Sequence, residues 1–470
     1  MSQFERELPL NGWAVLGRRY PATPDLLAPG SLRQCTDSAC VADHGAGADL
    51  IDTLYYGDNL EILQRFVSDE TVDLVYLDQP FNKNKAYSLI FRDESGRTSD
   101  AQLATLEDYW HWGPTPSRHY DYLTNSGVHE GRVPHGVSDL MGALHSSIRP
   151  SPLLAYLVEM TTRLLELHRV LRPTGSLYLH CDPTASHYLK VVLDAVFGPE
   201  NYRSEITWQR TNIHNDSKEW SAVSDRLLYY LKDIRAPFTW NAPRFPHSVE
   251  HVQSKYRNQD PDGRAYTLSD MRSPNPRPNL MYDWKGFQPH ANGWAYSRAT
   301  MERLDAEGRI WYPDSKDKRP RLKRYLDEMP GTVMTNVWTD INPINSQAHE
   351  RLGYPTQKPV ALLDRIIRAS SNPGDVVLDP FCGCGTAIEA CVSAGRKWIG
   401  IDISNLAVEV ICDRMEALGM DIALFDWPTE LDGVRRMVEA PGGRHRFEAW
   451  ALTRLGAQPV HELVSRFANR

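Results

Sequence analysis

One stretch of the sequence, residues 376–402, constrains the fold more than any other. An apolar run leads into a turn that holds Gly383 and Gly385, a helical segment follows, and a second apolar run ends at Asp402. This order is typical of a βαβ unit in a parallel sheet. The glycines let a ligand approach the backbone at the helix N-terminus, and an acid at a strand tip can accept hydrogen bonds from ribose hydroxyls. The stretch therefore predicts a site for a nucleotide-like ligand.

The same alternation of strand and helix patterns recurs through much of the chain. Apolar runs at 53–56, 72–77 and 175–180 predict strands, whereas the apolar periodicity of 153–171 and 188–197 predicts helices. Such alternation predicts an α/β fold with a doubly wound, mostly parallel, Rossmann-like sheet. Ligands bind at the carboxyl ends of the strands in these sheets, so the residues that follow the strand at 72–77 form a candidate reaction site.

Shifts in composition divide the chain into five parts. We expect a first α/β half with a polar insertion over 92–150, which we interpret as a loop with a helical patch near 103–112. The middle of the chain is dense in Pro, Arg, Tyr, Trp and Asn and predicts an irregular region. The expected parts are an N-terminal arm (1–47), the first α/β half (48–208), the middle region (209–350), a second α/β half (351–425) and a tail (426–470).

Composition excludes several classes of protein. No apolar run reaches the roughly 18 residues that a membrane span needs, and we see no secretory signal, so we expect a cytoplasmic protein without a membrane partner. The seven cysteines are scattered and lack paired metal-ligand spacing, which predicts a reduced protein without a bound metal. Cys35 and Cys40 could form half of a metal site, but no second half is evident.

Charge is unevenly distributed. The formal net charge is −8, which argues against a protein that coats nucleic acid. Between residues 203 and 328, however, 22 Lys and Arg stand against 17 Asp and Glu. A basic middle within an acidic chain suits local contact with a polyanion, although a solvated basic surface explains the count equally well.

Three motifs, in a particular order, give the sequence a family likeness. Residues 78–81 (Asp-Gln-Pro-Phe) come first, residues 354–359 (Tyr-Pro-Thr-Gln-Lys-Pro) follow the basic middle, and residues 379–386 come last. Together they resemble the β-group of amino DNA methyltransferases, over roughly residues 50–415. The resemblance implies a class I methyltransferase fold with permuted motif order, in which 48–208 is the catalytic half, 209–350 the target-recognition region and 351–425 the half that binds S-adenosylmethionine.

The resemblance assigns the reaction to the first motif. These enzymes methylate the exocyclic amine of adenine or cytosine, which is a poor nucleophile because its lone pair is delocalised into the ring. Asp78 and the backbone carbonyl of Gln79 would accept its two N–H bonds and favour a nucleophilic nitrogen. Pro80 shapes the turn, and Phe81 would stack on the base once it is flipped from the duplex.

The resemblance also assigns residues to the cofactor, S-adenosylmethionine. Two of them have simpler readings, because Asp402 could be a strand-end cap and Lys358 a surface lysine. At another strand end, His180 and its neighbours Cys181 and Asp182 are expected to be structural, because no paired ligand or base is evident. The cofactor residues are Asp379, Phe381, Gly383 and Gly385 around the methionine part, Thr356 and Lys358 at the methionine end, Asp402 on the ribose hydroxyls and Asp58 near the adenine ring.

One residue departs from the family pattern. The family motif has two prolines after the acid, and Gln79 occupies the first of these positions. The backbone carbonyl is retained, but the fixed φ of proline is lost. We therefore expect a mobile turn with reduced or unusual activity on an unchanged fold, a hypothesis that a Gln79→Pro variant tests.

The tail carries a second, weaker resemblance. Residues 446–459 resemble the opening of an Mrr-type restriction endonuclease module, and the chain ends at Arg470 before a nuclease motif could follow. We interpret the tail as a stub of such a module, or alternatively as a simple C-terminal helix.

The motifs together predict a site-specific DNA methyltransferase that acts in restriction-modification or epigenetic marking. Adenine N6 is favoured over cytosine N4 because an acid at the head of the catalytic motif is the usual adenine pattern in this family. Double-stranded DNA is the expected partner; a homodimer and a restriction endonuclease partner are left open. The alternatives are a catalytically weakened DNA-binding protein of the same fold and a methyltransferase for RNA.

Overall fold

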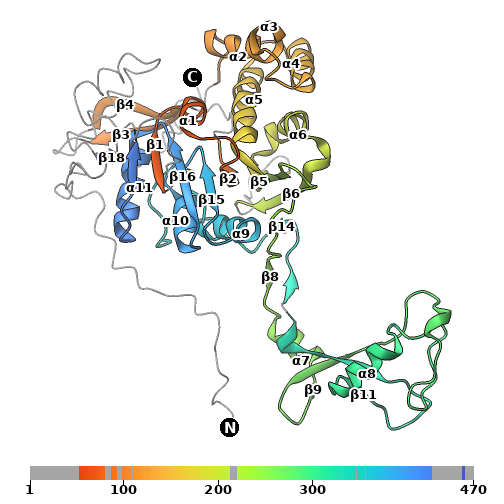
Figure 1. The fold of residues 1–470 in the computed structure, drawn as a ribbon. Coiled ribbons are helices and arrows are strands. Elements are labelled where there is room, and N and C mark those ends of the chain that lie inside the picture. The colour runs from red at the N-terminus through yellow and green to blue at the C-terminus, as the bar shows by residue number, and fades with distance from the viewer. Residues whose placement is uncertain are drawn as a thin grey trace. The chain divides into compact units, whose positions relative to one another are not determined.

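The computed structural model describes residues 52–79, 86–92, 98–107, 110–211, 220–329, 331–345, 347–354, 356–425 and 458–460, with the backbone alone for 86–92, 98–107 and 458–460. The chain forms two compact units (Figure 1). Unit 2 is Asn241–Asn336, and unit 1 combines the chain on either side of it. The predicted N-terminal arm, the Mrr-like segment except for residues 458–459, and the motif residues Pro80 and Phe81 lie outside the described residues.

A nine-stranded sheet organises the described part of unit 1. All of its strands run parallel except β7, which is antiparallel to both of its neighbours. In spatial order the strands are β14 (Val337–Trp338), β6 (Tyr202–Gln209), β7 (Ser224–Leu231), β5 (Leu171–Cys181), β2 (Val72–Leu77), β15 (Val376–Asp379), β16 (Lys397–Asp402), β1 (Thr53–Tyr56) and β17 (Ala423–Phe425).

Helices cover both faces of this sheet (Figure 1). Successive strand residues point to opposite faces, so Leu77 and Ile401 join one apolar core while Tyr76 and Val377 join the other. The result is a three-layer α/β fold, which confirms the predicted class. The first core contains α1 (Asn59–Phe66), α5 (Pro152–Val170) and α6 (Pro183–Phe197), and the second contains α9 (Val360–Ser370), α10 (Thr386–Ser393) and α11 (Asn405–Ala417).

The order of the strands creates a switch point between β2 and β15. From β2 the chain continues to β5 on one side, whereas from β15 it continues to β16 on the other side. The two connections diverge, and a crevice is expected where the carboxyl ends of these neighbouring strands meet. The crevice lies where the first and the last sequence motifs end their strands.

The insertion over 92–150 is more ordered than the sequence predicted. Its described residues form three helices, of which two contribute Leu123, Val137 and Met141 to the core shared with α5. A few apolar residues per helix are enough because the helices pack on a large apolar neighbour, and the polar remainder faces solvent. The helices are α2 (Pro114–Thr124), α3 (Ser126–His129) and α4 (His135–Ile148).

The predicted helical patch near 103–112 is wrong over its first half. Residues Thr98–Glu107 form strand β4, which pairs with β3 (Ala86–Arg92) along most of its length. The opposite edge of β3 pairs with β18 (Gln458–Val460), close to the C-terminus. Pairing with distant strands overrides a local helical pattern, because the ladder satisfies the backbone hydrogen bonds.

Unit 2 has a small core of its own. Met271, Trp284 and Trp294 are buried in it, and the indole of Trp294 donates a 2.8 Å hydrogen bond to the Tyr282 carbonyl oxygen. The elements are the sheet β11 (Ile310–Trp311), β12 (Arg321–Tyr325), β10 (Ala265–Ser269) and β9 (Asn258–Gln259), the pair β8 (Arg244–Phe245) and β13 (Thr332–Val333), and the helices α7 (Val249–Lys255) and α8 (Arg298–Ala306).

Unit 2 covers fewer residues than the middle region, 209–350, that composition predicted. The flanking strands β7 and β14 are part of the large sheet instead. Across the described part of both units, no helix is both long and apolar enough to cross a membrane.

Candidate active site

Five polar residues lie at the carboxyl edge of the large sheet. His180 is near the end of β5, Asp78 follows β2, Asp379 ends β15, Asp402 ends β16 and Asp58 follows β1. These strands are consecutive neighbours in the sheet. Parallel strands present their carboxyl ends on one edge, so residues that are hundreds of positions apart in sequence form one row. Asp78 and Asp379 flank the switch point.

Asp78 is paired with a lysine. The Lys358 ammonium donates a short hydrogen bond to Asp78 Oδ2, and the lysine side chain is only 9% exposed. Lys358 precedes α9, so the second α/β half delivers the counter-ion for an acid of the first. The reading of Lys358 as an ordinary surface lysine does not fit this burial.

A second polar network lies behind Asp78. His180 Nδ1 is 3.9 Å from Asp78 Oδ1 and 2.9 Å from the Tyr76 hydroxyl. On its other side, His180 Nε2 is 3.2 Å from Asp225 Oδ2, and Arg210 Nε donates to Asp225 Oδ1 at 2.9 Å. Neighbouring strands β2, β5 and β7 bring these side chains together.

Burial and neighbouring charges determine which groups in this network carry protons. Burial alone would raise the pKa of Asp225, but the hydrogen bond and charge of His180, together with the Arg210 charge, lower it overall. Burial, followed by the charge of Asp78, raises the pKa of Tyr76 well above its usual value, so its hydroxyl stays protonated. An ionised Asp225 accepts the proton of His180 Nε2 and thereby fixes the ring orientation.

Sequence reasoning found His180 but missed the link to Asp225. The signal was an acid inside the apolar strand β7, where a charge requires a partner. The neighbours of His180 are structural, as expected: burial raises the pKa of the Cys181 thiol well above its usual value, and Asp182 accepts from Thr184 N at 3.1 Å at the start of α6.

Gln79 is anchored by its side chain. It is 1% exposed, and its Nε2 donates a 3.0 Å hydrogen bond to the hydroxyl of Tyr156 on α5. Gln79 Oε1 is buried without a hydrogen-bond partner among the described residues. Packing and one hydrogen bond thus replace part of the restriction that a proline would impose on φ.

Asp379 is a buried acid at the centre of the row. Its Oδ1 accepts a 3.1 Å hydrogen bond from the backbone N–H of Phe381. Burial, followed by the nearby charges of Asp78 and Asp402, raises its pKa well above the usual value. Two acids at the ends of adjacent strands therefore have different surroundings, because Asp78 has Lys358 as its hydrogen-bonded counter-ion.

Asp402 organises the neighbouring turn. Its Oδ2 accepts from Gly383 N and its Oδ1 from Ser404 N, each at 2.8 Å, and its carbonyl oxygen accepts from Gly57 N at 3.0 Å. Burial raises its pKa to about 6. Asp402 thus caps the local backbone, as the simpler reading expected, and each carboxylate oxygen retains a further lone pair for a ligand.

The backbone at the start of α10 has a conformation that lets a ligand approach it closely. Gly383 and Gly385 have φ values of +52° and +73°, and a Cβ on Gly385 would lie 2.8 Å from Ile411 Cγ1. Gly385 is the N-cap of α10 and has no side chain to cap the first-turn N–H groups, which favours an anionic ligand there. Thr356 also has a positive φ, +64°, a strained conformation for a β-branched residue that is typical of ligand sites.

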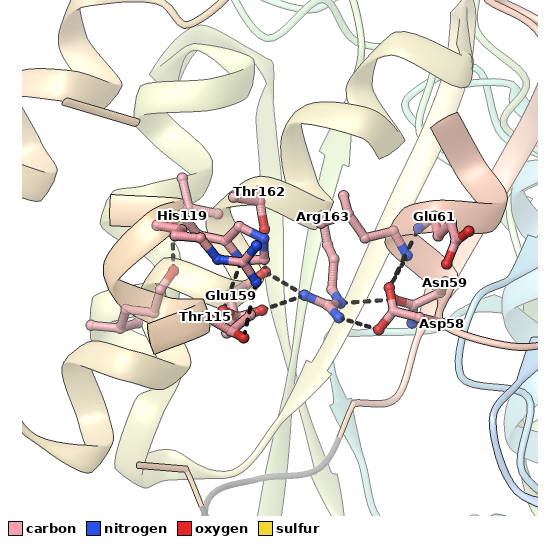
Figure 2. Close-up of polar contacts among 12 residues, drawn as sticks. Asp58, Asn59, Glu61, Thr115, His119, Glu159, Thr162 and Arg163 are labelled. Carbon is pink, nitrogen blue, oxygen red and sulfur yellow. Dashed lines mark hydrogen bonds and ion pairs between the residues drawn. The ribbon is translucent and has the colours of Figure 1, made fainter. Parts of the chain in front are cut away.

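Asp58 begins helix α1. Its Oδ1 accepts from Leu60 N at 2.9 Å, and its Oδ2 lies 2.9 Å from Arg163 Nη2 (Figure 2). The adjacent Asn59 donates from Nδ2 to the Pro380 carbonyl oxygen at 2.7 Å. Sequence reasoning missed Asn59 and Arg163; the available signal was a pair of charged residues, Glu159 and Arg163, at i and i+4 in an apolar helix.

Comparisons with known proteins agree with this geometry. Residues 72–413 match the family described as DNA methylase, of the N6/N4 methyltransferase type. The chain is 33% identical over 263 residues to the type II methyltransferase M.EcaI of Enterobacter cloacae, across 55% of this chain and 57% of M.EcaI. It is 25% identical over 361 residues to the Mod subunit of the type III restriction-modification enzyme StyLTI of Salmonella typhimurium, across 73% of this chain and 50% of that subunit.

Two further matches are shorter or more distant. The DNA adenine methyltransferase YhdJ of Escherichia coli is 47% identical over 99 residues, 21% of this chain and 32% of that protein. The crystal structure of the M1.HpyAVI–SAM complex aligns with a TM-score of 0.34 and 15% identity, over 77% of this chain and 98% of that one. The chain spans about half the length of M.EcaI and of the Mod subunit.

Proposed function

The chain belongs to the N6/N4 DNA methylase family, and on that premise we propose that it transfers the methyl group of S-adenosylmethionine to the N6 amine of adenine in duplex DNA. One observation carries the proposal. Asp78, with its lysine counter-ion, lies at the end of β2 beside the turn that follows β15, on the two sides of the switch point. The proposed amine acceptor and the proposed cofactor turn are therefore neighbours at the carboxyl edge of the sheet.

Asp78 acts as the acceptor for the target amine. An ionised carboxylate accepts an N–H bond and draws the amine nitrogen toward a tetrahedral, nucleophilic geometry. Lys358 places a positive charge beside Asp78, and burial raises the pKa of the nearby Asp379. The backbone carbonyl of Gln79 is proposed to accept the second N–H bond, and Phe81 to stack on the flipped base.

The residues at the carboxyl edge fit S-adenosylmethionine, which supplies an electrophilic methyl group when bound. The Asp402 carboxylate accepts from the ribose hydroxyls, and the uncapped N-terminus of α10 at Gly385 suits the methionine carboxylate. Asp58 lies near the adenine ring. The residues proposed for the methionine part are Thr356, Lys358, Asp379, Phe381, Gly383 and Gly385.

Adenine is the proposed base for two reasons. An acid, Asp78, heads the catalytic motif, which is the usual adenine pattern in the resemblance described above. The relative YhdJ, which matches 21% of this chain, is a DNA adenine methyltransferase. Cytosine N4 is the competing outcome of the same chemistry.

Duplex DNA is the proposed polymer, with unit 2 as the core of the target-recognition region, 209–350. Unit 2 carries 16 Lys and Arg against 12 Asp and Glu. On β12 and the turn before it, Lys318, Arg321 and Arg324 are exposed. Such cations bind phosphates and supply the salt-dependent part of DNA affinity.

Methyl incorporation from labelled cofactor tests the function. The unaltered chain and an Asp78→Ala variant are incubated with duplex DNA, with duplex RNA and without a polymer. We expect incorporation into DNA that disappears with Asp78→Ala. Incorporation into RNA alone would support the RNA alternative.

A second candidate function is a DNA-binding protein with weakened turnover. The buried, unpartnered Oε1 of Gln79 favours it, because such an atom carries a desolvation penalty beside the reacting centre. Tight, salt-sensitive DNA binding without transfer would support this candidate. A Gln79→Pro variant that then methylates DNA would identify Gln79 as the cause.

Partners beyond DNA follow from the relatives. The Mod relative is a subunit of a restriction-modification enzyme, and we propose that this chain also works beside a restriction endonuclease. Size-exclusion chromatography with light scattering distinguishes a homodimer from a monomer.

A further inference from the structure

A line of polar contacts connects the helical insertion to the start of α1 (Figure 2). On α2, His119 Nδ1 lies 2.7 Å from Glu159 Oε1. Glu159 Oε2 accepts from Arg163 Nη1 at 2.9 Å, one turn further along α5. Arg163 Nη2 then lies 2.9 Å from Asp58 Oδ2, so the line spans three helices.

Burial strengthens the contacts of Arg163 with Glu159 and Asn59, whereas the Asp58 side chain is 41% exposed. Glu159 is 5% exposed, Asn59 6% and Arg163 8%. Burial alone would raise the pKa of Glu159, but the hydrogen bond from His119 and the charge of Arg163 lower it overall, so the carboxylate stays ionised. A desolvated ionic contact of this kind loses far more when one partner is removed than an exposed pair does.

Arg163 makes contacts through all three nitrogens of its guanidinium group. Besides the contacts of Nη1 and Nη2, its Nε donates to Asn59 Oδ1 at 2.7 Å. Asn59 Nδ2 is thereby turned toward the Pro380 carbonyl oxygen, to which it donates at 2.7 Å. A planar fork can hold three acceptors in fixed directions, which a lysine ammonium cannot do.

Pro380 lies in the turn between Asp379 and Gly383, and Asp58 lies at the end of β1 on the far side of β16. Both are at the edge where the methyl donor is proposed to bind. Arg163 is the residue that contacts Asp58 directly and the Pro380 turn through Asn59.

We propose that Arg163 is a positioning residue of the methyl-donor site, which fixes Asp58 and, through Asn59, the turn after β15. The inference rests on the proposed function, since it assumes that S-adenosylmethionine binds at this turn. Arg163 acts on cofactor affinity, and it does not contact the target base. Its loss therefore raises KM for the cofactor more than it lowers kcat.

The experiment measures S-adenosylmethionine binding by calorimetry on the full chain. We expect Arg163→Lys to weaken binding about tenfold or more, the loss of charge-assisted hydrogen bonds, and to raise KM for the cofactor by a similar factor. Arg169→Lys is the matched control, because Arg169 is on the same helix and contacts the other end of α1, through the Leu63 and Val67 carbonyls. We expect the control to bind the cofactor as the unaltered chain does.

A second variant separates positioning from folding. Asn59→Ala cuts the link to Pro380 and leaves the Arg163 pairs with Glu159 and Asp58 in place. We expect it to weaken cofactor binding, and the double variant Arg163→Lys with Asn59→Ala to weaken it little beyond the single variants, because contacts that act in series are not additive. Cofactor binding unchanged in Asn59→Ala would overturn the inference even if Arg163→Lys fails to fold.

The outcomes distinguish this inference from the proposed function. If the unaltered chain binds the cofactor and Arg163→Lys binds as well as Arg169→Lys, the positioning role is wrong and the function stands. If the unaltered chain does not bind S-adenosylmethionine, the proposed cofactor is wrong and the inference is overturned with it.

Discussion

At the level of single residues, the proposed chemistry depends on the pair formed by Asp78 and Lys358. Asp379, one strand away, is buried and has a raised pKa, whereas Asp78 has a counter-ion, Lys358, from the other half of the chain. Two acids with different surroundings can take different roles, here proposed as the acceptor of the target amine and as part of the methyl-donor site.

Removal of this lysine should therefore impair turnover. We predict that Lys358→Met lowers kcat for methyl transfer about 100-fold or more, since breaking a buried ion pair costs about 3–5 kcal/mol. Single-turnover kinetics on duplex DNA measure the effect. Arg368→Met, which removes an exposed partner of Asp364 on the same helix, is the control. Equal rates in the two variants would contradict the role of Lys358.

The raised pKa of Asp402 predicts a pH dependence of cofactor binding. Burial raises this pKa to about 6, and the ribose contact uses the ionised form. As the pH falls below 6 the ionised fraction falls, so affinity for S-adenosylmethionine should drop about tenfold per unit. Calorimetry between pH 5 and 8 tests this. Asp402→Asn should bind weakly at every pH, and a slope retained in that variant would assign the titration to another group.

At the level of elements, the proposed function has so far given no role to the connection between β6 and β7. Because β7 starts opposite the end of β5, with Arg226 paired to Cys181, the described ends of this connection, 210–211 and 220–223, lie at the carboxyl edge of the sheet. Trp220 lies in it and is 95% exposed. A large aromatic side chain held in water beside the reaction edge is suited to stacking on a nucleic-acid base.

Trp220 should therefore contribute to DNA binding. We predict that Trp220→Ala raises KM for duplex DNA by about 5- to 100-fold, the cost of roughly 1–3 kcal/mol for one lost base stack, without changing cofactor affinity. Trp240→Ala is the matched control, since Trp240 is 49% exposed and stacks on Tyr229. An equal change of KM in both variants would argue against a specific contact.

Some elements of the fold could be predicted from the sequence and others could not. The apolar strands β2, β15 and β16 were predictable because buried parallel strands form continuous apolar runs. Strand β4 was not, because its state depends on pairing with β3. The contacts His180–Asp225 and Arg163–Asp58 were equally hidden. Each joins elements that are distant in sequence, and local periodicity does not encode the partner of a side chain on another element.

On the scale of the whole molecule, the proposed chemistry and the proposed recognition of DNA fall to separate units. The row of acids at the sheet edge is in unit 1, whereas unit 2 has an independent core around Trp294 and an excess of cations. A negative protein can therefore bind a polyanion through one locally basic unit.

This division predicts a selective loss of DNA affinity. Neutralising Lys318, Arg321 and Arg324 to Gln should weaken DNA binding and reduce the slope of log K against log salt by up to about 2.7, or 0.9 per lost phosphate contact. Cofactor binding should not change. Neutralising Arg264 and Arg303, whose charges are paired with Asp327 and Glu307, is the control and should have a smaller effect. Fluorescence anisotropy across a salt series measures both.

The most direct test of the central claim is nucleoside mass spectrometry of unmethylated duplex DNA incubated with the full chain and S-adenosylmethionine. We predict N6-methyladenine in the digest, and its absence when Asp78→Asn replaces the unaltered chain. N4-methylcytosine would contradict the assignment of the base. The absence of any methylated nucleoside from DNA that the chain demonstrably binds would contradict the assignment of the reaction.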